Sequence, residues 1–264
     1  MSLLQMNFMS RSLSRQVTVN AIIPLPRGGR PGEPAPEKKP LKSMYLLHGI
    51  FGNYADWVLN ADLVSYAERS GIAIFMPSGD NSFYVDDAVR GNNYGEFIGR
   101  ELVEVTRDMF KLSEKPEDTC IAGLSMGGFG ALRNGLKYHE TFGFIAALSS
   151  ALITYNMAES TEDAPWTFGR RSYYQSVFGD IDSFGESDNN PENLIKTIKA
   201  SGGNAPKIYM ACGTEDGLVT LNRRYRDFLA AEGIPCDYEE GPGVHDWRFW
   251  DSYIRKAIDK FLGK

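Results

Sequence analysis

The fold is decided by one stretch, TCIAGLSMGGFGAL, at residues 119–132. It predicts a short buried strand, a sharp turn and the start of a helix. Its centre, Gly123 to Gly127, matches G-x-S-x-G, in which a serine occupies a strained turn between small residues that avoid clashes. The N-terminus of the following helix would favour negative charge developing near the Ser125 hydroxyl. A glycine-rich turn without chemistry could carry the same five residues, so the prediction depends on the flanking strand and helix patterns.

The composition is that of an ordinary globular protein. The chain has 264 residues, 42% hydrophobic and 23% charged, with a formal net charge of −6. This length suffices for one large core, so we predict a single domain over residues 1–264. The acidic balance and the lack of a basic run argue against nucleic-acid partners and anionic membranes. No segment approaches the ~20 consecutive apolar residues that span a bilayer.

Three cysteines, Cys120, Cys212 and Cys236, lie in or beside apolar runs. An odd number in core-like positions predicts reduced thiols and a reducing compartment. Their spacing does not fit a zinc site, and we expect neither a metal nor a cofactor. The N-terminal residues lack the basic start and continuous apolar segment of a secretion signal. We therefore predict a cytoplasmic protein.

Runs typical of strands alternate with helical patterns along most of the chain. Beside the strand of the elbow stretch, strands are predicted at 16–23, 44–50, 72–77, 142–150, 207–213 and 235–240. Beside the helix after the elbow, helices are predicted at 60–70, 97–112, 191–200, 219–232 and 247–262. This alternation predicts an α/β fold with a mostly parallel sheet and helices on both faces. In such sheets the ligand crevice lies beyond the carboxyl ends of the strands.

Three segments interrupt this pattern. Residues 27–40 are rich in proline, glycine and charged residues, which predicts a surface loop. Residues 78–95 form a loop of a length that is often functional. Residues 151–206 are rich in aromatic residues and acidic loops. We predict that this last segment is a short, cap-like insertion after the sixth strand, folded over the active-site end of the sheet.

A serine hydroxyl needs an adjacent base to act as a nucleophile, and the chain has three histidines. His139 lies about four turns from Ser125 along the predicted helix, too far to reach it, and we interpret it as a solvated helix terminus. His48 follows a central strand, where a buried histidine that shapes the loop is the stronger interpretation. His245 lies in the loop directly after the last predicted strand, the position that a base needs, and it is our candidate.

The carboxylate that orients the base should also follow a strand. Asp216 comes directly after the strand at 207–213, with Glu215 as its nearest competitor. An ordinary Asp-Gly turn would give the same residues without a catalytic role. The resulting order, Ser125, Asp216, His245, is that of α/β-hydrolases and differs from the orders in chymotrypsin-like and subtilisin-like enzymes.

Two backbone N–H groups must stabilise the oxyanion of an acyl-transfer intermediate. One should be that of Met126, directly after the nucleophile, and the other should come from the loop after His48-Gly49. Ile50 is our candidate for the second donor and Phe51 the alternative. The loops that follow the strands also supply four candidate substrate contacts: His48, Phe51, Trp57 and Trp247.

Five segments in this order resemble the esterase D-like family of α/β-hydrolases: YLLHG at 45–49, GN…W at 52–57, AGLSMGGFGA at 122–131, CGTED at 212–216 and GVHDW at 243–247. The family includes tributyrin-type carboxylesterases, S-formylglutathione hydrolases, feruloyl and acetyl-xylan esterases, and mycolyltransferases. The resemblance is greatest to the bacterial tributyrin or acetyl esterases. It implies an α/β-hydrolase fold, metal-independent hydrolysis, and the triad and oxyanion donors named above.

The resemblance implies a serine carboxylesterase acting on small, short-chain acyl esters such as acetyl and butyryl esters. An S-formylglutathione hydrolase is the nearest alternative, although the three cysteines look buried in strands, which favours oxygen esters. A feruloyl or acetyl-xylan esterase is equally compatible with the aromatic residues at 151–206. A non-catalytic, hydrolase-like binding module and an acyltransferase are further alternatives. By analogy, small esterases of this kind often form homo-oligomers.

Overall fold

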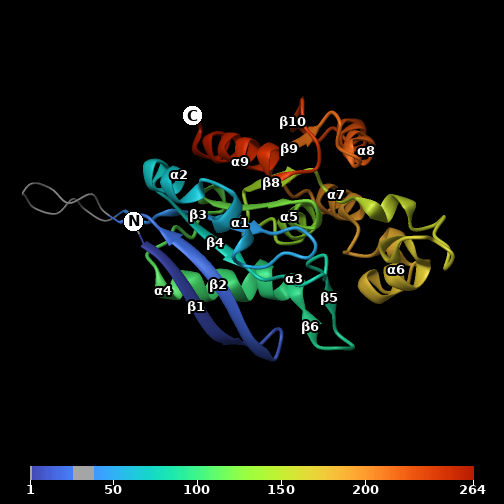
Figure 1. Ribbon diagram of the computed structural model, residues 1–264, viewed down its shortest axis with the longest axis horizontal. Helices are drawn as coiled ribbons and strands as arrows, with labels where there is room; N and C mark the ends of the chain where they lie inside the picture. The colour runs from blue at the N-terminus through green and yellow to red at the C-terminus, as the bar shows by residue number, and fades with distance from the viewer. Residues whose placement is uncertain (1, 26–38) are drawn as a thin grey trace, which may run out of the picture.

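The computed structural model describes residues 2–25 and 39–264, so most of the loop predicted at 27–40 lies outside the described residues. An eight-stranded sheet forms the centre of the molecule, in the order β1-β2-β4-β3-β7-β8-β9-β10 (Figure 1). Its strands are β1 Ser2–Ser10, β2 Arg15–Ile23, β3 Lys42–Leu47, β4 Ile72–Pro77, β7 Thr119–Leu124, β8 Phe144–Leu148, β9 Lys207–Gly213 and β10 Cys236–Gly241.

From β4 to β10 neighbouring strands are parallel, as the alternating sequence pattern predicts. At the other edge, β1 and β2 form an antiparallel hairpin, and β2 pairs antiparallel with β4. The strand β1 was not predicted. Its sequence SLLQMNFMS mixes polar and apolar residues because it is an edge strand, and most of its side chains are exposed or half-buried.

Helices cover both faces of the sheet. The helices are α1 Asp56–Asn60, α2 Leu63–Ser70, α3 Tyr94–Glu96, α4 Leu102–Met109, α5 Met126–Lys137, α6 Arg171–Phe178, α7 Pro191–Ala200, α8 Val219–Ala231 and α9 Trp247–Leu262. Strand residues alternate between the faces: in β3, Met44 and Leu46 belong to the core cluster that includes residues of α2 and α9, whereas Tyr45 and Leu47 belong to the cluster that includes residues of α4, α5 and α8. Helices α2 and α9 lie side by side (Figure 1). Within the described ranges, no helix is both long and apolar enough to cross a bilayer.

Two predicted segments, the helix at 97–112 and the loop at 78–95, contain shorter elements that were not predicted. The helix predicted at 97–112 begins with a π-helical turn, Phe97–Glu101, before α4. The loop at 78–95 contains a small antiparallel pair, β5 Asp86–Asp87 and β6 Asn92–Asn93.

The Glu101 carboxylate accepts hydrogen bonds from Ser10 Oγ and the Arg11 and Ser12 N–H groups. It thereby ties the π-helical turn to the turn between β1 and β2.

Residues 151–206 follow β8, the sixth strand of the large sheet along the chain. This segment holds α6 and α7, and α6 lies at the opposite end of the molecule from the N-terminus (Figure 1). Phe178 of α6 packs against Phe83 and Phe129, with ring centroids 5.2 and 5.6 Å away. Phe168 lies 5.3 Å from Phe51 in the loop after β3. The segment therefore contacts the carboxyl-end loops of the sheet.

Candidate active site

Ser125 occupies the turn between β7 and α5 with φ 54° and ψ −117°, a strained backbone conformation for a residue with a side chain. Close packing around the turn requires glycine. A Cβ at Gly123 would lie 2.2 Å from the Gly127 carbonyl oxygen, and one at Gly127 would lie 2.6 Å from the carbonyl oxygens of Leu47 and His48. The N-terminus of α5 follows directly, so its partial positive charge lies beside the hydroxyl.

His245 follows β10 and reaches Ser125 across the carboxyl edge of the sheet. Its Nε2 lies 3.0 Å from Ser125 Oγ. The next residue, Asp246, caps α9 by accepting hydrogen bonds from the Arg248 and Phe249 N–H groups. The ring of His245 packs perpendicular to Trp250 at 4.8 Å. The start of α9 therefore fixes the loop that carries the imidazole.

Asp216, after β9, is buried and lies next to the same histidine. Its Oδ2 is 2.8 Å from His245 Nδ1, and its Oδ1 accepts a hydrogen bond from the Leu218 N–H at 2.8 Å. Burial alone would raise the pKa of Asp216, but the hydrogen bonds from His245 and Leu218 outweigh it and hold this pKa below its ordinary value. An ionised Asp216 makes Nδ1 the protonated nitrogen and leaves Nε2 free to accept a proton from Ser125.

Glu215, the competing acid, points elsewhere. Its Oε2 accepts hydrogen bonds from the Gly243 N–H and from Thr214 Oγ1, each at 2.7 Å. Its own N–H donates to the Gly243 carbonyl at 3.1 Å. Glu215 therefore braces the loop that leads to His245, and of the two acids Asp216 contacts the imidazole.

The two predicted oxyanion donors belong to two segments that meet at the nucleophile turn, since a Cβ at Gly49 would lie 3.5 Å from the Cβ of Ser125. Met126 is the first residue of α5, and Ile50 lies in the loop after β3. The alternative donor, the Phe51 N–H, already donates to Asn81 Oδ1 at 2.9 Å. The Phe51 N–H is therefore already engaged, and Ile50 stays the predicted second donor.

His48 and Trp57, two of the candidate substrate contacts, are buried. His48 Nε2 accepts a hydrogen bond from the Gly79 N–H at 2.8 Å, and Nδ1 lies 2.6 Å from the Gly49 carbonyl oxygen. Burial lowers the pKa of His48, which favours the neutral imidazole. Because Nε2 accepts from the Gly79 N–H, the proton of the neutral ring is on Nδ1. Trp57 Nε1 donates to the Leu47 carbonyl at 3.0 Å. His48 therefore links the loop after β3 to Gly79, and Trp57 is bonded to the end of β3.

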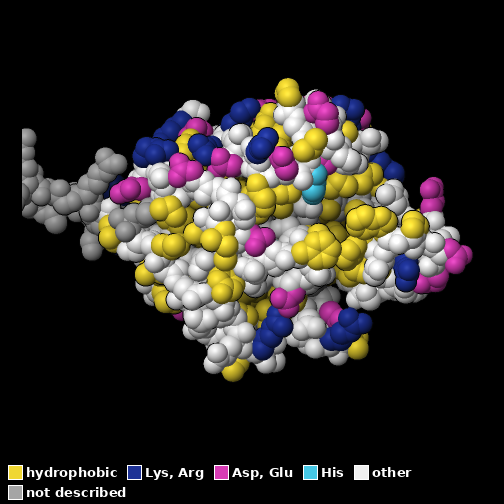
Figure 2. All heavy atoms as spheres, in the orientation of Figure 1, with side chains coloured by type: hydrophobic (Ala, Val, Ile, Leu, Met, Phe, Trp, Pro, Cys, Tyr) yellow, Lys and Arg dark blue, Asp and Glu magenta, His cyan; other side chains and the backbone are white. Residues whose placement is uncertain are grey.

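The other two candidate contacts lie nearer the surface. Trp247 is half-buried and packs edge-on against Trp57 at 5.1 Å. Phe51 is 71% exposed and Val244, next to His245, is 49% exposed. Figure 2 shows a histidine side chain on this face beside a hollow bordered by hydrophobic side chains. His139, by contrast, lies half-buried at the end of α5 with Nδ1 3.1 Å from the Leu136 carbonyl oxygen.

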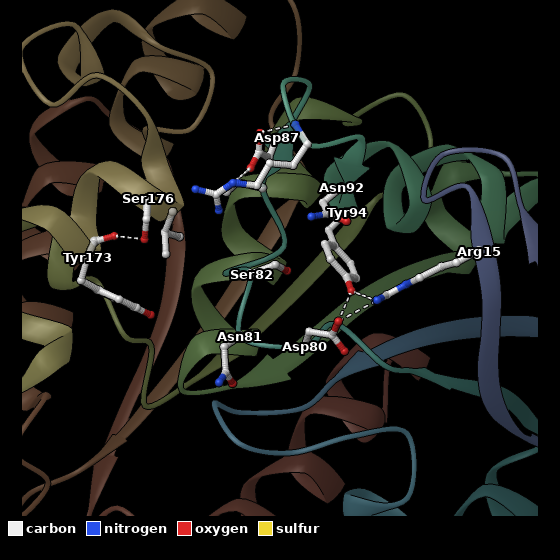
Figure 3. Close-up of a pocket in the computed structure, with 12 residues that line it drawn as sticks. Arg15, Asp80, Asn81, Ser82, Asp87, Asn92, Tyr94, Tyr173 and Ser176 are labelled. Atoms are coloured by element: carbon white, nitrogen blue, oxygen red, sulfur yellow. Dashed lines mark hydrogen bonds and ion pairs between the residues drawn. The ribbon is translucent and has the colours of Figure 1, made fainter.

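A pocket of about 270 Å³ opens beside the loop after β3, and its residues were not predicted as a site (Figure 3). Asn81, the partner of the Phe51 N–H, forms part of its wall. Asp80, Tyr94 and Arg15 form a hydrogen-bonded group on one side, with Tyr173 and Ser176 of α6 facing them. The unusual length of the loop at 78–95 was the only signal in the sequence.

No group of three or more histidine, cysteine, aspartate or glutamate side chains in the described residues could hold a metal ion. The three cysteines are free thiols, with Cys120 and Cys212 buried and Cys236 half-buried. Burial raises the pKa of Cys212 to about 12. None of these thiols therefore lies in the exposed, electropositive surroundings of a reactive cysteine.

Comparison with known proteins agrees with this architecture. The sequence matches the family model named Esterase, described as "Putative esterase", over residues 10–261. An acetyl esterase of Caldicellulosiruptor saccharolyticus is 45% identical over 259 residues, which cover 98% of this chain and 97% of the relative. The structure of FphF, a fluorophosphonate-binding serine hydrolase of Staphylococcus aureus, superposes with a TM-score of 0.86 at 27% identity, covering 100% of this chain and 99% of that one.

The S-formylglutathione hydrolase FrmB of the same organism superposes with a TM-score of 0.84 at 27% identity, covering 99% of this chain and 98% of that one. These relatives confirm the predicted α/β-hydrolase fold and the resemblance to esterase D-like enzymes. The chain belongs to the Esterase family and is a serine carboxylesterase of the α/β-hydrolase fold.

Proposed function

We propose that Ser125, His245 and Asp216 form a catalytic triad that hydrolyses short-chain acyl esters through an acyl-enzyme on Ser125. The observation that carries the proposal is the continuous pair of contacts, Ser125 Oγ to His245 Nε2 at 3.0 Å and His245 Nδ1 to Asp216 Oδ2 at 2.8 Å. A base within hydrogen-bond reach of the nucleophile, oriented by a third group, is the arrangement that activates a serine.

In the first half of the reaction, Ser125 Oγ attacks the ester carbonyl carbon while His245 Nε2 takes the hydroxyl proton. The carbonyl oxygen becomes an oxyanion, which accepts hydrogen bonds from the Ile50 and Met126 N–H groups. When the intermediate collapses, the bond to the alcohol oxygen breaks and His245 returns its proton to that oxygen. Asp216 keeps the imidazole oriented and stabilises its positive charge throughout.

In the second half, a water molecule attacks the acyl carbonyl and gives a proton to His245 Nε2. The second tetrahedral intermediate breaks its bond to Ser125 Oγ, which regains the proton, and the carboxylic acid leaves. Ser125 and His245 thereby return to their starting protonation states.

The 45% identical relative, which is named an acetyl esterase, supports a short acyl chain. Its aligned segment covers 98% of this chain.

The S-formylglutathione hydrolase remains the second candidate because FrmB superposes over nearly the whole chain. The feruloyl and acetyl-xylan alternatives differ in the acyl group and the alcohol. Comparing kcat/KM for acetyl, butyryl and feruloyl esters and for S-formylglutathione separates these candidates. We expect acetyl and butyryl esters to be preferred by at least about tenfold, which corresponds to 1.4 kcal/mol of transition-state binding. A higher value for S-formylglutathione would reverse the assignment.

A fluorophosphonate probe tests the triad itself. Such probes phosphonylate activated serines with loss of fluoride, and FphF is named for binding them. We expect the wild-type protein to be labelled at Ser125, and Ser125→Ala to remain folded, unlabelled and at least about 10⁴-fold slower with p-nitrophenyl acetate. An unlabelled wild-type protein would indicate a non-catalytic binding module. Product analysis with added alcohols separates hydrolysis from acyl transfer.

The cellular setting and assembly are further parts of the proposal. The three free thiols support a reducing compartment, and we assign the protein to the cytoplasm. Size-exclusion chromatography with light scattering tests whether the chain forms the homo-oligomer that analogy suggests.

A further inference from the structure

The loop after β4, residues 78–84, is bonded to the loop after β3 at four points. Gly79 N–H donates to His48 Nε2 at 2.8 Å, and Tyr84 Oη donates to the His48 carbonyl at 2.9 Å. Tyr54 N–H donates to Ser78 Oγ at 3.2 Å. The fourth bond, from Phe51 N–H to Asn81 Oδ1 at 2.9 Å, is the one nearest to Ile50.

The Phe51 backbone is held in a conformation that a residue with a side chain rarely adopts. Its φ is +69°, in the left-handed region. A conformation of this kind costs of the order of 1–3 kcal/mol and persists where surrounding groups enforce it. The peptide unit that carries the Phe51 N–H also carries the Ile50 carbonyl. The acceptor on that N–H therefore helps to set the orientation of Ile50.

Asn81 is itself held in place by its neighbour. Asp80 accepts hydrogen bonds from Arg15 of β2 at 2.6 Å and from Tyr94 of α3 at 2.5 Å (Figure 3). Although burial alone would raise the pKa of Asp80, these two bonds hold it below its ordinary value. The carboxylate thus stays ionised, and the loop is tied to two elements that lie outside the triad.

We propose that Asn81 is a positioning residue for the oxyanion hole: its Oδ1 holds the Phe51 N–H and thereby directs the Ile50 N–H toward the oxyanion. The inference rests on the proposed role of Ile50. The side chain of Asn81 is exposed, so its hydrogen bond is not needed to fill the core. Oxyanion donors act through fixed geometry, and a displacement of about 1 Å can cost about 100-fold in rate.

The test compares Asn81→Ala, Asn81→Asp and a matched control. Asn7→Ala is the control because Asn7 is another exposed asparagine whose Oδ1 accepts a side-chain hydrogen bond, from Thr18 Oγ1 at 2.8 Å, on the distant hairpin. With p-nitrophenyl acetate we expect Asn81→Ala to lower kcat by about 10- to 100-fold with KM within about threefold. A trifluoromethyl ketone, which forms the tetrahedral oxyanion, should bind more weakly by a similar factor.

Asn81→Asp keeps an acceptor oxygen at the same position, so it should recover most of the lost kcat at 0.15 M salt, where an exposed charge is screened. A purely structural role would lower the melting temperature without changing the ratio of inhibitor to substrate affinity. Wild-type kcat and inhibitor affinity in Asn81→Ala would overturn the inference. So would equal kcat for the Ala and Asp variants, since the acceptor would then not matter.

Fluorophosphonate labelling separates this inference from the proposed function. Labelling of Ser125 in Asn81→Ala should still reach completion, because the triad is intact, but more slowly than in the wild type. A wild-type protein that is not labelled would contradict the esterase mechanism. A labelled wild type with an equally fast Asn81→Ala would contradict only the role of Asn81.

Discussion

Ser125 and His245 are 120 residues apart in the chain, yet Oγ of one lies 3.0 Å from Nε2 of the other. The parallel sheet accounts for this proximity, because β7 and β10 both end at the same edge. Ser125 follows β7 directly and His245 follows β10 after a short loop. Asp216 follows β9, the strand that pairs with β10. The carboxyl ends of β7, β9 and β10 therefore position the three residues of the proposed triad.

Replacing Asp216 by asparagine should lower kcat by about 10⁴-fold, because an amide no longer fixes the Nδ1–H form of His245 or stabilises its positive charge. Glu215→Gln is the matched control next to it. It keeps an oxygen acceptor for the Gly243 N–H, so we expect less than a tenfold loss, about 1.4 kcal/mol. Steady-state kinetics with p-nitrophenyl acetate measure both. A larger loss in Glu215→Gln than in Asp216→Asn would exchange the roles of the two acids.

Much of the fold could be predicted because buried parallel strands are short apolar runs. The predicted strands at 72–77 and 207–213 and the helix at 247–262 coincide with β4, β9 and α9. Helix α6 was missed, since its sequence RSYYQSVF lies in an aromatic segment without a clear period. Strand β1 was missed because an edge strand has no face that must be wholly apolar.

The residues around the candidate site also fall into some that could be predicted from the sequence and some that could not. Residues that directly follow strands were placed by topology, since all parallel strands of one sheet end on the same side. Asn81 and the group of Arg15, Asp80 and Tyr94 could not be placed. Their contacts depend on a loop in which Asp80, Phe83 and Tyr84 have positive φ. Residues other than glycine give no sequence signal for that conformation, and Arg15 reaches it from a strand far away in the chain.

As the pH is lowered from 7 to 5, the free energy of unfolding should fall more for the wild-type protein than for the His48→Asn variant. Burial lowers the pKa of His48 in the folded protein, whereas an unfolded histidine titrates near 6.5. As the pH falls below about 6.5, the unfolded chain binds this proton before the folded one does, so unfolding is favoured. The effect is absent above the unfolded pKa.

Urea unfolding at several pH values measures this difference. Carboxylates contribute equally to the wild type and to His48→Asn, so they cancel when the two curves are subtracted. His48→Asn should also be less stable at pH 8 by about 1–3 kcal/mol, because the Gly79 N–H loses its acceptor. Parallel curves for the two proteins would show that His48 does not have the lowered pKa.

Arg133→Met should destabilise the protein by about 3 kcal/mol, the lower end of the range for breaking a buried ion pair. The guanidinium of Arg133 is buried in α5 and donates to Asp86 Oδ2 at 3.3 Å, to the Asp188 carbonyl at 3.0 Å and to Asn189 Oδ1 at 3.1 Å. It therefore connects the elbow helix to the loop before α7 in the 151–206 segment. Lys137, 2.6 Å from Asp188, moderates the loss.

The control for Arg133 is Arg100→Met, which removes an exposed pair with Glu96 at 3.1 Å. Exposed pairs of this kind contribute about 0.5 kcal/mol or less. Urea unfolding compares the two variants, and limited proteolysis reports whether residues 151–206 become accessible in Arg133→Met. Equal effects of the two substitutions would mean that the buried arginine does not hold the segment.

Gly123→Ala should disable the enzyme by displacing the elbow. The added Cβ would meet the carbonyl oxygen of Gly127 at 2.2 Å, and this atom belongs to the backbone of α5, so no flexible side chain can move aside. We expect a loss of stability of about 3 kcal/mol, at the upper end of overpacking. Because Ser125 lies between Gly123 and Gly127, a shift of α5 also shifts the nucleophile. We therefore expect kcat/KM to fall by about 100-fold or more in protein that remains folded.

Gly185→Ala separates this effect from the general effect of replacing a glycine. Nothing lies within 4 Å of a Cβ at Gly185, so stability should stay within about 0.5 kcal/mol of the wild type and activity should be unchanged. Melting temperatures identify conditions in which both variants are fully folded, and the fluorophosphonate labelling rate is then measured there. A folded Gly123→Ala that is labelled as fast as Gly185→Ala would mean that the turn tolerates a displaced α5. The close packing of Gly123 on Gly127 would then serve the stability of the fold and not the position of the nucleophile.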